Sequence, residues 1–125
     1  MYLVDTNVIS EARKKSKANK GVREFFTHAV ADETRMFISV VTAGELRRGV
    51  EMIRHRGDLR QANRLEKWLE ALLFEYKDHI LDIDQDIAQL WGRLRVPHPE
   101  NALDKQIAAT ALIYDLTVVT RNHKD

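Results

Sequence analysis

Short apolar runs alternate with helix-forming segments along this chain of 125 residues, and this alternation constrains the fold more than any other feature. The apolar runs are rich in β-branched and aromatic residues, which favour strands; they lie at residues 2–4, 36–41, 79–83 and 116–120. Between them, apolar side chains recur every three or four positions, which indicates helices; these segments are 6–15, 22–30, 42–56, 58–76, 87–94 and 102–114. Strands that alternate with helices predict an α/β fold, with a short parallel sheet flanked by helices on both faces.

The length of the chain fits one domain, and we see no repeat, low-complexity tract or interdomain linker in it. We therefore expect a single domain over residues 1–125. The chain stops five residues after the last predicted strand. Either the terminus is short or a C-terminal tail is missing, and the sequence leaves both alternatives open.

Several classes of protein are excluded by composition. Cysteine is absent, which rules out disulfides, zinc–thiolate sites and a thiol nucleophile. The longest apolar runs are far shorter than the roughly 18 residues of a membrane span, and the N-terminus lacks a basic segment followed by an apolar stretch. We expect a cytoplasmic protein that does not enter a membrane.

Four carboxylates fall near the carboxyl ends of predicted strands, where ligands bind in open α/β sheets. Asp5 ends the first strand, Glu45 lies one turn into the helix after the second, and Asp104 begins a late helix. Asp125 follows the fourth strand. Oxygen donors from Thr6, Asn7 and Thr120 lie nearby, and such a set suits Mg²⁺ or Mn²⁺. Ions of this kind assist phosphodiester cleavage in many nucleases.

Helix capping is the alternative explanation for these acids. Thr42 and Glu45 have the spacing of a capping box, and Asn101 with Asp104 is similar. Asp5 is placed to cap the first helix. Spacing alone leaves capping and metal binding about equally supported.

Four segments around the acids form a specific combination of motifs. The first is Tyr2-Leu-Val-Asp5-Thr6-Asn7-Val-Ile-Ser10-Glu11, and the second is Ile38-Ser-Val-Val-Thr42-Ala-Gly44-Glu45-Leu-Arg47-Arg48-Gly49. The third is Asp104-Lys-Gln-Ile107-Ala-Ala-Thr110-Ala-Leu112, and the fourth is Val119-Thr120-Arg121-Asn122-His-Lys-Asp125. In this order the segments closely resemble PIN-domain ribonucleases of the VapC/FitB toxin type. The family usually continues past the last acid with a phenylalanine and another strand, which this chain lacks. Residues 57–78 carry no diagnostic motif.

The resemblance implies a PIN-like fold and a role for each acid. Asp5 and Asp104 would be the direct metal ligands, while Glu45 and Asp125 would complete the charge and hold metal-bound water. Thr6 and Thr120 match hydroxyl positions beside the site. The family cleaves RNA with a divalent metal, usually as the toxin of a type II toxin–antitoxin pair. The implied partners are therefore an RNA substrate, a VapB/FitA-like antitoxin and a second copy of the chain in a homodimer.

Basic residues cluster in two places that fit RNA binding. Arg13, Lys14 and Lys15 follow the first helix, and Arg47 and Arg48 belong to the second motif. Such side chains can hold the phosphates that flank a cleaved bond, although charged runs are more often solvated faces. The five histidines lack metal-ligand spacing. Only His123, beside the predicted site, is worth testing, and the alternative is an ordinary loop histidine.

Three other functions are alternatives to this prediction. A phosphatase of the haloacid-dehalogenase type needs a second aspartate two residues after the first, where this chain has Asn7. A phosphorylated receiver domain needs an acidic pair at the first strand and a lysine after a late strand, where this chain has Arg121. A catalytically silent PIN-like binding module is the non-enzymatic alternative, and the four intact acids count against it.

Overall fold

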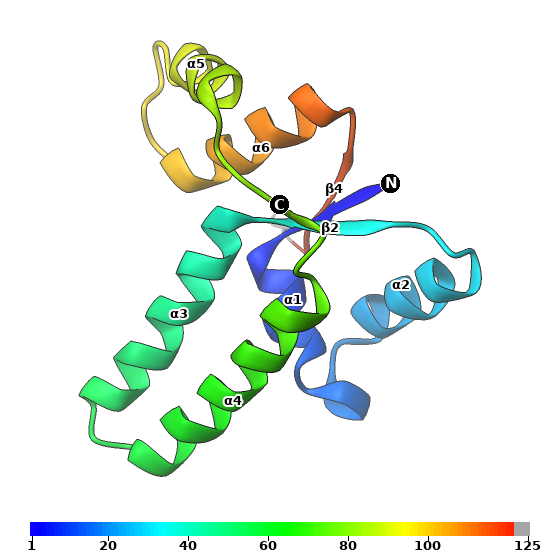
Figure 1. Ribbon diagram of the computed structural model, residues 1–125, viewed down its shortest axis with the longest axis vertical. Coiled ribbons are helices and arrows are strands. Elements are labelled where there is room, and N and C mark those ends of the chain that lie inside the picture. The colour runs from blue at the N-terminus through cyan, green and yellow to red at the C-terminus, as the bar shows by residue number, and fades with distance from the viewer. Residues whose placement is uncertain (122–125) are drawn as a thin grey trace.

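The computed structural model describes residues 1–121, which form four strands and six α-helices with one short 3₁₀ helix. In chain order they are β1 (Tyr2–Val4), α1 (Thr6–Ala12), the 3₁₀ helix (Lys15–Lys17), α2 (Lys20–Ala31), β2 (Met36–Ser39), α3 (Val40–His55), α4 (Leu59–Glu75), β3 (Ile80–Leu81), α5 (Gln85–Leu94), α6 (Ala102–Tyr114) and β4 (Thr117–Val119). Figure 1 shows these elements from blue to red along the chain.

The four strands form one parallel sheet in the order β3-β2-β1-β4. Tyr2 pairs with Met36 on one side and with Thr117 on the other, so the first strand lies between the second and the last. Because all strands run the same way, their carboxyl ends share one edge. The predicted α/β fold with a short parallel sheet is confirmed.

Helices cover both faces of the sheet, as Figure 1 shows. Leu3 and Val4 are fully buried, and as consecutive strand residues they point to opposite faces. Val4 belongs to the larger apolar core, which α1, α2, α3 and α4 complete. Leu3 packs with Ile107 and Ala111 of α6 in a smaller core on the other face. Burial of both faces explains why these strands read as continuous apolar runs rather than alternating ones.

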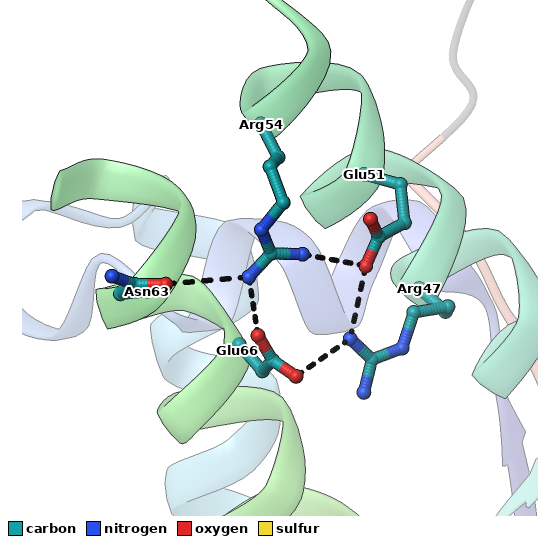
Figure 2. A network of polar contacts seen from close by, with 5 residues as sticks. All are labelled: Arg47, Glu51, Arg54, Asn63 and Glu66. Atoms are coloured by element: carbon teal, nitrogen blue, oxygen red, sulfur yellow. Dashed lines mark hydrogen bonds and ion pairs between the residues drawn. The ribbon is translucent and has the colours of Figure 1, made fainter. Parts of the chain in front are cut away.

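Helices α3 and α4 form a hairpin that extends away from the sheet (Figure 1). A network of charged side chains joins the two helices (Figure 2). Arg54 donates to Glu66 on α4, to Asn63 Oδ1 at 3.3 Å and to Glu51 Oε2 at 2.6 Å. Arg47 Nη1 lies 3.3 Å from Glu51 Oε2 and 3.2 Å from Glu66 Oε2. Each carboxylate thus contacts both guanidinium groups, which fixes the register of α3 against α4.

Some predicted boundaries are wrong by a few residues. The apolar run predicts that the second strand extends to Val41, but Val40 and Val41 form the first turn of α3. The hydroxyl of Ser39 accepts from the Val41 N–H at 3.0 Å, so this cap starts the helix despite the β-preference of valine. The first helix ends at Ala12 rather than at Lys15, which has a left-handed φ of 55°. The third strand is limited to Ile80–Leu81.

Within residues 1–121, no helix is both long enough and apolar enough to cross a membrane.

Candidate functional site

An open pocket of about 480 Å³ lies at the carboxyl edge of the sheet. It is bounded by the residues that follow β1 and β4 and by the first turns of α6. Its lining residues are Asp5, Asn7, Asp104, Ile107, Ala108, Val118, Thr120 and Arg121. This is the edge at which the sequence predicted that the acids would converge.

Asp5 is held in the pocket wall by two hydrogen bonds. It follows β1 with extended backbone and caps α1, where its Oδ1 accepts from the Thr6 N–H at 2.7 Å. Its Oδ2 accepts from the Thr120 hydroxyl at 3.1 Å. The predicted capping role of Asp5 is therefore confirmed. It does not exclude a role in the pocket, because the carboxylate is half-buried and lines the cavity.

Asp104 reaches the same pocket from the first turn of α6, and it is exposed. The helix N-terminus carries a partial positive charge that favours a carboxylate there. Asn101 precedes the helix in a left-handed conformation with φ 59°, and its side chain makes no capping hydrogen bond. The side-chain cap suggested by the Asn101–Asp104 spacing is absent from the described helix terminus.

Glu45 is half-buried on α3 and does not line this pocket. The capping box predicted for Thr42 and Glu45 is wrong, because α3 begins at Val40 and Ser39 caps it. Glu45 Oε1 instead accepts from the Thr6 hydroxyl at 2.6 Å. Thr6 Oγ1 also lies 3.0 Å from Thr42 Oγ1. A hydroxyl carries one proton, so Thr6 donates to Glu45 and accepts from Thr42.

Of the remaining predicted oxygen donors, two line the pocket and one belongs to the C-terminal residues that the structure does not describe. Asn7 and Thr120 both line the pocket and are exposed. Asp125, the fourth predicted acid, and His123 lie outside the described residues 1–121. Two of the four predicted acids therefore share one pocket, and Glu45 is linked to Asp5 through the adjacent Thr6.

None of the five basic residues predicted to bind RNA lines this pocket. Arg13 and Lys15 line a separate, more apolar cavity beside α4, and Arg48 is exposed on α3. Lys14 pairs with Glu11 at 3.1 Å, and Arg47 belongs to the network between α3 and α4.

Sequence reasoning missed Arg121, whose side chain lines the pocket with Asp5 and Asp104. It also missed Glu11, which binds Arg121 from α1 at 3.0 Å. The place of Arg121 directly after the last strand was the available signal, since this edge of the sheet was already suspected.

The pocket residues fit a hard divalent cation. Asp5, Asn7, Asp104 and Thr120 offer only oxygen ligands, apart from the amide nitrogen of Asn7. Within residues 1–121 no three His, Cys, Asp or Glu side chains gather closely enough to hold a metal. Mg²⁺ typically takes one or two protein carboxylates and completes its shell with waters and substrate phosphates. Two carboxylates in an open pocket satisfy that requirement.

Comparison with known proteins gives the same family as the sequence motifs. The chain is 32% identical to Toxin FitB of Neisseria gonorrhoeae, over 98% of this chain and 88% of that protein. It is 33% identical to the plasmid stability protein StbB of Pseudomonas syringae pv. tomato, with the same coverage of both chains. The crystal structure of FitAcB from Neisseria gonorrhoeae superposes with a TM-score of 0.80 at 32% identity, over 97% of this chain and 87% of that one.

A more distant solved structure shares the fold. VapBC2 of Rickettsia felis, bound to a promoter DNA fragment, has a TM-score of 0.73 at 21% identity over 97% of this chain and 86% of that one. The family model described as the PIN domain matches residues 2–124. With that match over nearly the whole chain, this protein belongs to the PIN-domain family.

Proposed function

We propose that this protein is a ribonuclease that cleaves RNA phosphodiester bonds with Mg²⁺ or Mn²⁺, and that it is the toxin of a toxin–antitoxin pair. One observation carries the proposal. Asp5 and Asp104, from opposite ends of the chain, line a single open pocket at the carboxyl edge of a parallel sheet.

Asp5 and Asp104 would hold the cation, and a bound cation would neutralise negative charge that builds on the phosphate during cleavage. The chain itself orients these ligands. The Thr6 N–H and the Thr120 hydroxyl each bond one oxygen of Asp5, which fixes the plane of that carboxylate. We assign Glu45, held by Thr6, to accept a proton from the attacking water. Asp125 is proposed as the fourth acid.

The toxin role is supported by the names of the relatives. FitB is called a toxin, and the similar solved structures include FitAB bound to DNA, at 30% identity, and a toxin–antitoxin complex from Klebsiella pneumoniae. By analogy we propose that a small antitoxin binds this chain and blocks its activity. The homodimer and the cytoplasmic location stay predictions, as does a single domain over residues 1–125.

Cleavage of RNA by the purified protein tests the enzymatic part of this proposal. We expect cleavage with Mg²⁺ or Mn²⁺, none after exhaustive chelation, and recovery when metal is restored. Asp104→Asn keeps the shape of the side chain but removes its charge, so turnover should nearly vanish. The matched control is Asp115→Asn at the other end of α6. Asp115 has a left-handed φ of 57°, which asparagine adopts readily, and it is outside the pocket.

Wild-type cleavage by Asp104→Asn, or cleavage that persists without metal, would overturn the mechanism. A folded protein that binds RNA but cleaves none under any metal condition would instead identify a silent binding module.

Expression in a bacterial host tests the toxin role. The protein alone should slow growth, and co-expression with the reading frame adjacent to its gene should relieve that effect. If growth is normal and no partner co-purifies, the toxin assignment fails while the nuclease assignment stands.

A further inference from the structure

The buried carboxylate of Glu11 lies outside the pocket and pairs with Arg121, whose side chain lines the pocket. Glu11, in the last turn of α1, is only 7% exposed. Its Oε2 accepts from the Asn19 N–H at 2.8 Å, and its Oε1 lies 3.0 Å from Arg121 Nη1 and 3.1 Å from Lys14 Nζ. The Asn19 N–H, and then the Lys14 ammonium, lower the pKa of Glu11, so it is ionised at neutral pH.

Arg121 is the basic side chain that lines the pocket within residues 1–121. The Arg121 guanidinium donates to Glu11 through Nη1, and the Arg121 side chain is 38% exposed. A guanidinium has five N–H donors in a planar fork, so donors remain for a ligand. This fork matches the oxygens of a phosphate.

The two residues that follow β4, Thr120 and Arg121, are bonded to opposite ends of α1. Thr120 is hydrogen-bonded to Asp5 at the start of that helix, and Arg121 is paired with Glu11 at its end. Two consecutive residues after β4 are therefore tied to one rigid element. This arrangement limits how far the guanidinium can move.

The charges explain why a second anchor is needed. Arg121 shares its pocket with two carboxylates, Asp5 and Asp104, either of which would attract a mobile guanidinium. Glu11 competes for that guanidinium from a site shielded from solvent, where Coulomb attraction is screened less than at the surface. Glu11 therefore keeps Arg121 at the pocket wall and leaves the two acids available for a cation.

We propose that Arg121 binds a backbone phosphate of the RNA beside Asp5 and Asp104, and that Glu11 is the positioning residue for it. This inference rests on the proposed ribonuclease function, since it names a contact with that substrate. The proposed principal phosphate contact is therefore Arg121, in the pocket itself, and not one of the five basic residues suggested by sequence.

Equilibrium binding of a labelled single-stranded RNA, without divalent metal and over a series of salt concentrations, tests the contact without cleavage. Arg121→Gln should weaken binding roughly tenfold, as expected for loss of a charged hydrogen bond. The slope of log K against log salt should fall by about 0.7, the contribution of one phosphate contact on a single strand. Arg121→Lys keeps the charge and should keep the wild-type slope.

The matched control is Arg60→Gln, which makes the same charge change at an exposed residue near the tip of the α3–α4 hairpin. Its binding and salt slope should remain those of the wild type. If Arg121→Gln melts at a lower temperature but binds RNA with wild-type affinity and wild-type salt dependence, Arg121 has only a structural role. That result would overturn the proposal. A wild-type protein that binds no RNA overturns it as well.

Glu11→Gln tests whether Glu11 positions Arg121 or only repels RNA through its negative charge, because the two roles predict opposite changes in RNA affinity. Loss of a negative charge should tighten RNA binding in general, whereas loss of the anchor should weaken it several-fold. We expect weaker binding in the wild-type background and no weakening when Arg121→Gln is already present. Tighter binding in both backgrounds would refute the role of Glu11.

The two proposals fail in different ways. Asp104→Asn should abolish metal-dependent cleavage yet retain RNA binding and its dependence on Arg121. Absence of cleavage by the wild type would remove the nuclease function, while the salt slopes would still report whether Arg121 contacts phosphate.

Discussion

The Thr6 hydroxyl donates to Glu45 Oε1 over 2.6 Å and joins the start of α1 to α3. Thr6 is the residue after Asp5, and its own N–H binds the Asp5 carboxylate. One threonine therefore contacts two of the predicted acids, through its backbone and its side chain. This contact couples Glu45 to the pocket even though Glu45 does not line it.

Glu45→Gln should preserve the fold and remove most of the activity. Glutamine retains an oxygen that accepts from Thr6, so the free energy of unfolding should change by less than about 1 kcal/mol. It cannot accept a proton from water, and RNA cleavage should fall roughly a hundredfold or more. Denaturant unfolding and cleavage rates at saturating Mg²⁺ measure the two effects. Full activity would make Glu45 a structural residue.

The Thr6 contact can be tested by a double-mutant cycle. Thr6→Val removes the hydroxyl at nearly constant volume, whereas Thr6→Ser retains it. We expect Thr6→Val to reduce cleavage and Thr6→Ser to keep most of it. Combined with Glu45→Gln, Thr6→Val should add little further loss, because both changes disrupt one interaction. Strictly additive losses would show that the two residues act separately.

Asp5 combines a capping role with its proposed metal ligation, and two substitutions separate them. Asparagine caps helices as well as aspartate does, so the free energy of unfolding of Asp5→Asn should be close to that of the wild type. Asp5→Ala should lose about 1 kcal/mol of stability. Both variants should lose nearly all RNA cleavage, since each removes the charge. If Asp5→Asn cleaves at the wild-type rate, Asp5 is a cap alone.

Ser39→Ala tests where α3 begins. The Ser39 hydroxyl is fully buried and caps Val41, so its removal should cost about 1 kcal/mol of stability. Cleavage per folded molecule should be unchanged, because Ser39 is outside the pocket. Chemical denaturation provides the measurement. Unaltered stability would contradict the assigned cap.

The network between α3 and α4 should make stability depend on pH. The hydrogen bond from Arg54, and then that from Arg47, lowers the pKa of Glu66 below its ordinary value of 4.5. A lowered pKa in the folded state means that the ionised form stabilises the protein above pH 4.5, and that this stabilisation is lost as the pH falls further. Glu66→Gln should therefore lower the Tm by a few degrees at pH 7, and the difference from wild type should shrink below pH 4.5.

The control for that measurement is Glu70→Gln, which removes an exposed charge from the same helix. Its Tm should stay close to that of the wild type, as is usual for surface substitutions. A Tm difference for Glu66→Gln that is equal at pH 7 and at pH 3.5 would show that the ion pairs do not stabilise the hairpin.

The sequence alone was sufficient for the class of the fold and for the end of the sheet that carries the acids. Apolar runs without alternation indicate strands that are buried on both faces, and helices between successive strands favour parallel pairing, which needs crossover connections of that length. From that topology, Asp5 after β1 and Asp104 at the start of α6 had to lie toward the same edge. The structure places both in one pocket.

The partners of each side chain could not be read from spacing. The sequence pattern Thr42–Glu45 fits a capping box, but whether it caps depends on where the helix begins, and Ser39 moves that start three residues earlier. Glu45 is then free to bind Thr6, which is 39 residues away along the chain. The same holds for Glu11 and Arg121, which are separated by 110 residues and meet only because β4 lies beside β1. Local sequence sets which helices and strands form, whereas contacts between distant side chains depend on how the sheet aligns the ends of its strands.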